Sequence, residues 1–154
     1  PMRNEVYIRW MIRRDMREVL AIEAACFGSP WSEDDFIRAL RQRNSIGMVA
    51  EHDEEVIGYM VYELHKLRLH LLNLAVDPWV QRQRVGVQLL DNLKTKLSGH
   101  RNRILTEICE TNVAAQLFFR EQGFRAIHVM RDFYDDTDED AYLFQYRTPC
   151  PVRI

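Results

Sequence analysis

The chain has 154 residues, of which 47% are hydrophobic and 29% charged, and its formal net charge is −2. This length and composition predict one folded domain over residues 1–154, and the near-neutral charge argues against a basic nucleic-acid-binding surface. Neither a membrane-spanning apolar run nor a signal-peptide pattern is present, so we expect no membrane partner and a cytoplasmic location. The three cysteines and five histidines lack ligand spacing, so we predict no disulfide framework and no metal site.

The first part of the chain predicts one strand and two helices. Residues 6–12 read as a strand, and apolar residues at helical spacing predict a helix over 14–27. A second helix follows, with Ser32 as its N-cap and Asp35, three residues on, as a weaker form of the capping-box acid.

The middle of the chain predicts three strands and a helix. The segments 45–52 and 55–64 are separated by a short acidic turn and read as a hairpin. A longer strand over 67–76 ends at an Asp-Pro turn. The helix after residue 84 has leucines at four-residue spacing, through Leu97, and is expected to stop at Gly99.

The last part predicts a strand, a helix and two more strands. Residues 103–110 form the strand, and Asn112 caps a helix that ends at Gly123. The segments 124–134 and 141–147 are strands around an acidic loop. The whole order, β-α-α-β-β-β-α-β-α-β-β, predicts an α/β layered fold with a mixed sheet covered by helices.

Glutamine and arginine gather just before the predicted helix at 85, in the order Gln81, Arg82, Gln83 and Arg84. The amino end of a helix carries partial positive charge, so added cations there are unfavourable unless an anion is bound. This pattern indicates a bound phosphate, although solvated polar residues are the alternative for the stretch taken alone.

The stretch LNLAVDPWVQRQRVGVQLL (72–90) resembles the acetyl-CoA signature of the GNAT acetyltransferase superfamily. Within it, the chain resembles the ribosomal-protein-alanine N-acetyltransferase (RimI-type) branch. Supporting stretches are PWSE (30–33), NLAVDP (73–78), TEICETNVAAQLFFREQGF (106–124) and RDFYDDTDEDAYLF (131–144). The resemblance implies a single-domain α/β fold with a mixed, largely antiparallel sheet, splayed central strands and helices on both faces.

The resemblance also implies acetyl-CoA as cosubstrate and no metal. Strand backbone would grip the thioester and pantetheine arm, the loop before the helix would wrap the pyrophosphate, and Asn112 would touch the cofactor arm. The implied cofactor-binding residues are Leu74, Ala75, Val76, Gln81, Arg82, Gln83, Arg84, Val85, Gly86 and Asn112.

Arg84 departs from the family pattern, because it stands where the family has its first loop glycine. A left-handed backbone there would cost about 1–2 kcal/mol, whereas right-handed dihedrals would remove that cost. Arg84 could also add a charge-assisted contact to phosphate. We expect cofactor binding to be weakened or altered, not lost.

Glu107 is the candidate base. It lies in the strand at 103–110 on the same face as Leu105 and Cys109, an apolar setting expected to raise its pKa, and it matches the base glutamate of the RimI-type pattern. The alternative is a strand carboxylate that simply pairs with an arginine.

The general acid is the second departure. The family's tyrosine, seven residues after the capping asparagine, is Phe119 here, and a phenyl ring donates no proton. The available phenols are Tyr134 and Tyr142, of which we predict Tyr134. A thiol leaving group, with a pKa near 8.5, can also depart as thiolate.

Phe27, Pro30, Trp31 and Tyr134 are predicted by resemblance to border the peptide groove, with core and turn packing as the alternative. The acidic run at 135–140 would attract a basic peptide, such as the N-terminus of a ribosomal protein, or be merely a solvated loop. We expect a monomer or a weak homodimer.

The leading hypothesis is acetyl transfer from acetyl-CoA to the α-amine of a peptide or protein by direct attack, with Glu107 as base. An acetyltransferase of a small amine or a protein lysine is the first alternative. A non-catalytic acyl-CoA-binding regulatory module is the second, motivated by Arg84 and Phe119.

Overall fold

The protein is described here by a computed structural model that covers residues 5–80 and 84–149. Within these residues the chain forms two compact units. Unit 1 comprises Pro1–Leu64 and Leu72–Lys96, and unit 2 comprises His65–Leu71 and Leu97–Ile154. Among the described residues, no helix is long and apolar enough to cross a membrane.

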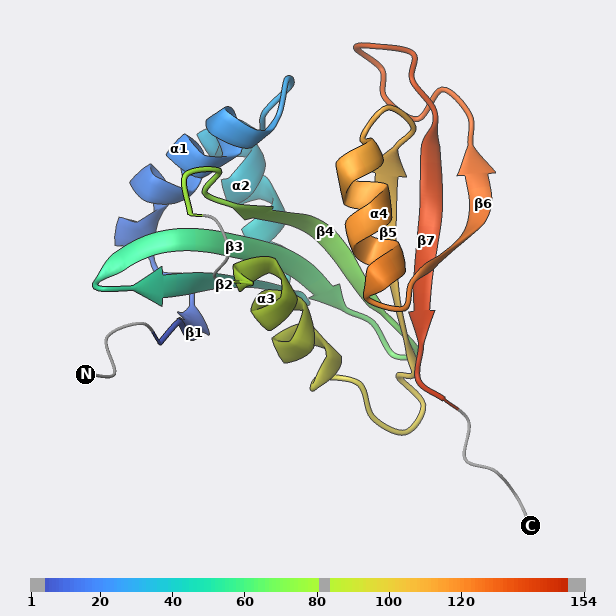
Figure 1. Cartoon of the computed structure of the whole chain (residues 1–154), viewed down its shortest axis with the longest axis horizontal. Helices are drawn as coiled ribbons and strands as arrows, with labels where there is room; N and C mark the ends of the chain where they lie inside the picture. The colour runs from blue at the N-terminus through green and yellow to red at the C-terminus, as the bar shows by residue number, and fades with distance from the viewer. Residues whose placement is uncertain (1–4, 81–83, 150–154) are drawn as a thin grey trace. The chain divides into compact units, whose positions relative to one another are not determined.

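Seven strands form one mixed sheet in the order β1-β2-β3-β4-β5-β7-β6 (Figure 1). Among the pairs with a described register, β4 and β5 run parallel and the others antiparallel. The predicted mixed, largely antiparallel sheet is therefore confirmed.

Unit 1 holds the N-terminal strands, a 3-10 helix and three of the four α-helices of the described residues. Its elements are β1 (Tyr7–Trp10), the short 3-10 helix η1 (Arg13–Asp15), α1 (Met16–Cys26), α2 (Glu33–Leu40), β2 (Ser45–His52), β3 (Glu55–Leu64) and α3 (Val85–Lys94). Strand β4 (Leu69–Val76) begins in unit 2 and ends in unit 1.

The hairpin of β2 and β3 is confirmed, with His52 opposite Glu55. The two residues between them, Asp53 and Glu54, both have positive φ, 49° and 67°. Positive φ at both positions gives the type I′ turn, whose twist matches that of the flanking strands.

Strand β3 is buried on both sides because helices cover both faces of the sheet in unit 1 (Figure 1). Tyr59 packs in one core with Val19 of α1 and Phe36 of α2. On the other side, a Cβ placed on Gly58 would lie 3.1 Å from Val85 Cγ1, so the glycine lets α3 approach closely. The predicted helices on both faces are confirmed in this unit.

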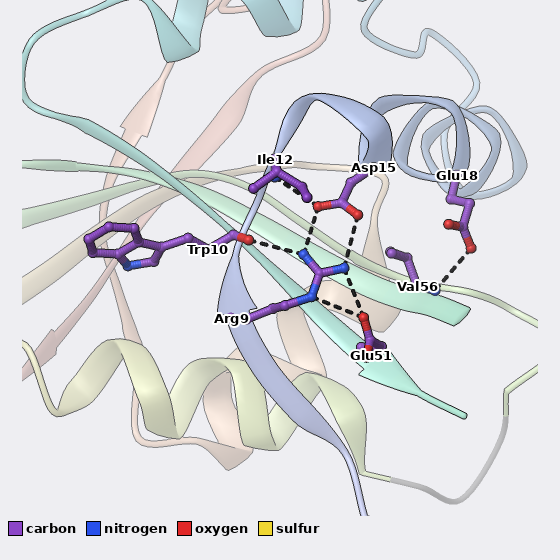
Figure 2. Close-up of polar contacts among 7 residues, drawn as sticks. All are labelled: Arg9, Trp10, Ile12, Asp15, Glu18, Glu51 and Val56. Carbon is purple, nitrogen blue, oxygen red and sulfur yellow. Dashed lines mark hydrogen bonds and ion pairs between the residues drawn. The ribbon is translucent and has the colours of Figure 1, made fainter. Parts of the chain in front are cut away.

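An ion-pair cluster ties the N-terminal strand into unit 1 (Figure 2). The guanidinium of Arg9 on β1 contacts both oxygens of Asp15 at 2.8 and 2.9 Å, and its Nε donates to Glu51 on β2 at 3.0 Å. Asp15 is only 2% exposed and also accepts from the Ile12 amide. The cluster therefore joins β1, β2 and the turn before α1.

Unit 2 contains β5 (Arg103–Cys109), α4 (Val113–Glu121), β6 (Arg125–Met130), β7 (Ala141–Arg147) and the first residues of β4. Strand β7 pairs with β5 over residues 141–147 and with β6 over residues 141–145. The parallel ladder of β4 and β5 joins three pairs, Leu69 with Ile104, His70 with Leu105 and Leu71 with Thr106.

Several element ends differ from the sequence prediction. Helix α3 ends at Lys94 and not near Gly99, since Thr95 Oγ1 donates to the Asn92 carbonyl and the Ser98 amide already donates to the Arg101 carbonyl. Strand β4 begins at Leu69, after a turn. Strand β6 ends at Met130, because Asp132 has a positive φ of 49° that interrupts an extended chain.

Candidate active site

Glu107 lies near the end of β5, on the less buried face of that strand. Burial alternates along β5: Ile104, Thr106 and Ile108 are buried, while Glu107 and its same-face neighbours are half-buried. The predicted sharing of a face with Leu105 and Cys109 follows from this alternation.

Among the described residues, the Glu107 carboxylate contacts a histidine and not the arginine of the alternative interpretation. His70 Nε2 on β4 lies 2.8 Å from Oε1 and 3.0 Å from Oε2 of Glu107. The two side chains are 24% and 17% exposed, so the pair is open to solvent on one side. The expected apolar setting is therefore wrong: Glu107 is held by a polar partner from the neighbouring parallel strand.

Tyr134 belongs to the same region of unit 2. Burial, followed by the negative charges of Cys109, Glu107 and Glu139, raises the pKa of Tyr134 to about 12. Its phenol therefore keeps its proton throughout the neutral range. Because Glu107 contributes to this shift, the candidate base and the candidate acid lie within electrostatic reach of one another.

Phe119 is part of the core of unit 2. It is 7% exposed and packs edge-to-face on Phe118 and Phe124, with ring centroids 5.2 and 5.0 Å away. The position at which the family pattern has a tyrosine thus carries an aromatic packing residue.

Asn112 caps α4, as predicted. Its side chain accepts a hydrogen bond from the Ala115 amide at 3.1 Å, and its own amide donates to the Cys109 carbonyl at 3.0 Å. The cap therefore begins directly after β5 and fixes the start of α4 beside the end of the Glu107 strand.

The predicted thioester segment, Leu74–Val76, forms the end of β4 in unit 1. Ala75 is buried, and the Val76 carbonyl accepts a hydrogen bond from Cys26 Sγ at 3.2 Å. Asp77 then turns the chain, since its side chain accepts from the Trp79 amide and its carbonyl accepts from Val80.

Arg84 adopts the left-handed conformation, with φ 52° and ψ 36°, as the N-cap of α3. It gives the helix no side-chain cap, in contrast to Asn112 at α4. The amides and the partial positive charge at a helix start attract anions, which fits the diphosphate of a nucleotide cofactor. The predicted contacts Gln81, Arg82 and Gln83 lie outside the described residues.

The end of β4 and the start of α3 meet at Gly58 of β3. A Cβ at Gly58 would lie 3.1 Å from the Val85 side chain and 3.2 Å from the Ala75 carbonyl. Unit 1 thus brings together two of the segments predicted to bind the cofactor, Leu74–Val76 and the start of α3.

The predicted peptide-bordering residues lie between α1 and α2. Phe27 and Trp31 are half-buried against the core of unit 1, and Pro30 is exposed. The Trp31 ring packs edge-to-face on Phe36 at 5.0 Å. Both predicted roles, packing and bordering a groove, are compatible with this partial burial.

His70 is the site residue that sequence reasoning missed. A histidine inside an apolar strand has no local signal for pairing with a carboxylate 37 residues away. The parallel register of β4 and β5 sets His70 opposite Leu105 and so brings it to Glu107.

The sequence profile of the Acetyltransferase (GNAT) family matches residues 16–124. A ribosomal protein bS18-alanine N-acetyltransferase of Escherichia coli strain K12 is 28% identical over 132 residues, which are 84% of this chain and 88% of that protein. A protein of Methanocaldococcus jannaschii named as an N-acetyltransferase is 27% identical over 144 residues, 92% of each chain.

The fold is similar to that of solved structures. The crystal structure of the ribosomal-protein-S18-alanine N-acetyltransferase from Escherichia coli matches with a TM-score of 0.83 at 24% identity, over 96% of this chain and 97% of that one. This likeness covers both compact units.

Proposed function

The chain belongs to the GNAT family of acetyl-CoA-dependent N-acetyltransferases, and we propose that its acceptor is the α-amine of a peptide or protein N-terminus. In this proposal Glu107 accepts the proton of the acceptor amine, directly or through water, and the neutral amine then attacks the acetyl carbonyl. The observation that carries the proposal is Glu107 itself: half-buried, held by His70, and within electrostatic reach of the protonated Tyr134.

The acidity of the acceptor favours an α-amine. An α-amino group with a pKa of about 8 is roughly a tenth neutral at pH 7, whereas a lysine near 10.4 is neutral in well under one part in a thousand. Deprotonation costs the α-amine roughly 1–1.5 kcal/mol and a lysine more than about 4 kcal/mol. A single carboxylate such as Glu107 is therefore sufficient to deprotonate an α-amine and poorly suited to deprotonate a lysine.

Acetyl-CoA supplies an activated acetyl thioester and a diphosphate. We assign the amides of the first turn of α3 and the Arg84 guanidinium to the diphosphate, because that helix start has no side-chain cap. The backbone of Leu74–Val76 is assigned to polarise the thioester carbonyl, and Asn112 to contact the cofactor arm. Tyr134 is assigned to protonate the leaving thiolate.

The acceptor peptide is expected to be basic. The loop between β6 and β7 carries acidic residues beside Tyr134, namely Asp135, Asp136, Asp138, Glu139 and Asp140. Negative charge next to the candidate acid would attract a cationic N-terminal segment. The name of the Escherichia coli relative supports a ribosomal protein as the acceptor, and the segment at Phe27, Pro30 and Trp31 is proposed to border it.

A peptide panel tests the proposal. Purified protein is incubated with acetyl-CoA and basic peptides with free N-termini, and release of free thiol and peptide mass are measured. We expect acetylation of the α-amine and none of the same peptide with a blocked N-terminus and an internal lysine. Acetylation of lysine, polyamines or free amino acids alone would contradict the proposed acceptor.

Two variants test the assigned base. Glu107→Gln keeps the size of the side chain but removes the carboxylate, and we expect kcat to fall about 100-fold or more. Glu121→Gln, an exposed carboxylate at the end of α4, is the matched control and should keep wild-type activity. Full activity in Glu107→Gln would remove the assignment.

A further inference from the structure

His70 bridges both oxygens of the candidate base. The distances from Nε2 to Oε1 and Oε2 of Glu107 are 2.8 and 3.0 Å, so one nitrogen is shared almost equally between the two oxygens. In the ionised form that the role of a base requires, the Glu107 carboxylate only accepts hydrogen bonds, and we assign the hydrogen to Nε2. This contact fixes the direction in which the Glu107 carboxylate points, with both oxygens turned toward His70.

The pairing register of β4 and β5 brings His70 and Glu107 into contact. His70 lies opposite Leu105 in the parallel ladder, and Glu107 lies two residues beyond Leu105, so His70 and Glu107 leave the same face. On the opposite, buried face, Thr106 Oγ1 donates to the Leu71 carbonyl at 3.0 Å and holds the two strands in this register. A shift of one residue would turn the two side chains to opposite faces.

The chemistry of the partner suits a base. An arginine or lysine would hold the carboxylate with a permanent positive charge and weaken its affinity for a proton. The His70 imidazole donates one hydrogen bond from Nε2, so the carboxylate is oriented without the permanent positive charge that an arginine or lysine carries. Oriented groups react faster because the reacting geometry no longer has to be found by rotation.

From this geometry we infer that His70 is a positioning residue for Glu107, fixing the direction in which the carboxylate points when it receives the proton of the acceptor amine. The inference rests on the proposed function. Glu107 takes one proton from the acceptor ammonium, and the neutral amine attacks the acetyl carbonyl. The C–S bond of the resulting intermediate breaks, the thiolate takes a proton from Tyr134 or water, and the second nitrogen proton is released to solvent, which reprotonates Tyr134. His70 touches neither the acceptor nor the cosubstrate in this scheme.

Two substitutions of His70 separate positioning from packing. Leucine fills a similar volume without a donor, whereas glutamine places an N–H group near the position of Nε2. We expect His70→Leu to lower kcat about 10- to 100-fold, with the KM for acetyl-CoA changed by no more than about twofold. His70→Gln should recover most of this loss, and His128→Gln on the exposed strand β6 is the matched control, with wild-type activity expected.

The kinetic result overturns the inference in two ways. Wild-type kcat in both variants would mean that the contact is not used in turnover. A glutamine that restores no more activity than leucine would mean that the residue acts through packing, especially if both variants lower the thermal unfolding midpoint equally.

Nitrogen NMR of the histidine rings provides a readout without turnover. We expect wild-type His70 to carry its hydrogen on Nε2 at neutral pH, and its Nε2 resonance to shift in Glu107→Ala. A His70 with its hydrogen on Nδ1 and none on Nε2 overturns the inference even if the enzyme is active. If the wild type acetylates no N-terminal peptide, the proposed function fails. The NMR result then tests by itself whether His70 donates a hydrogen bond to Glu107.

Discussion

Glu23 is a carboxylate buried inside unit 1 and held by hydrogen-bond donors from three segments. The Tyr59 hydroxyl donates to it, Asn73 Nδ2 lies 2.8 Å from Oε1, and the Trp31 amide lies 2.8 Å from Oε2. Burial, together with Glu23, raises the pKa of Tyr59. Since a buried charge is costly unless it is fully hydrogen-bonded, each of these donors contributes to stability.

Tyr59→Phe tests this network. The substitution removes one donor from a carboxylate that is 2% exposed, and we expect the free energy of unfolding to fall by about 1–3 kcal/mol. Urea denaturation followed by circular dichroism measures the change. Tyr7→Phe, at a tyrosine that is 69% exposed, is the control and should change stability by less than about 0.5 kcal/mol.

Tyr134 and Phe119 allow a reciprocal test of the acid. We expect Tyr134→Phe to lower kcat about 10- to 100-fold, a modest effect for general acid catalysis because the thiol of coenzyme A can leave as thiolate. Steady-state kinetics with a peptide acceptor measures it. An unchanged kcat would assign the proton to water or another group.

Phe119→Tyr is the companion variant. It adds a hydroxyl to a buried aromatic cluster, so we expect a loss of about 1–2 kcal/mol in stability and no large gain in rate. A rate gain of tenfold or more would show that the acid is missing in the natural chain and that Tyr134 does not supply it.

Helices α3 and α4 begin in different ways although both follow strands. Asn112 satisfies an amide of α4 with its own side chain, whereas Arg84 starts α3 in a left-handed conformation without a side-chain cap. The first arrangement stabilises the helix by itself. The second leaves the amides of α3 for an anion and adds a cation beside them, at the cost of a strained backbone.

Arg84→Gly and Arg84→Ala separate these two effects. Glycine removes the left-handed strain, so we expect Arg84→Gly to raise the free energy of unfolding by about 1 kcal/mol and Arg84→Ala to leave it nearly unchanged. Both variants lose the guanidinium and should bind coenzyme A about tenfold more weakly. Thermal unfolding and calorimetry measure the two quantities, and equal stability of the two variants would contradict the strain argument.

At the scale of the whole molecule, stability in acid depends on the Arg9–Asp15 ion pair. Burial of Asp15 opposes its ionisation, but hydrogen bonds from Arg9 and the Ile12 amide lower its pKa below the ordinary value. The unfolded chain therefore binds a proton at Asp15 at a pH where the folded chain does not. The stability from this pair is fully present above about pH 4 and is lost as pH falls through the lowered pKa.

Asp15→Asn tests this dependence. We expect the variant to be less stable than the wild type at pH 7 by about 1–3 kcal/mol and to lose less stability than the wild type between pH 4 and pH 2. Urea midpoints over this range measure both. Asp34→Asn, an exposed carboxylate in the first turn of α2, should follow the wild-type curve, and an unchanged acid slope in Asp15→Asn would exclude the ion pair as the cause.

The features of the fold that the sequence predicts correctly are those that depend on local interactions. The capping box at Ser32, the Asn112 cap, the hairpin at residues 52–55 and the order of elements depend on neighbours a few residues away, so periodicity and cap residues indicate them directly. The end of α3 was predicted too late because four-residue spacing continues to Leu97 although the helix does not.

The sequence by itself determined the acetyltransferase family, the positions of the strands and helices, and the placement of Glu107 on one face of its strand. Only the tertiary structure decided that Glu107 pairs with His70, that Glu23 is shared among three segments, and that Phe119 belongs to a core. The physical reason is the distance along the chain between the residues that interact. A periodic pattern records which side of an element is buried, whereas a contact between strands depends on register and packing, which no short stretch of sequence contains.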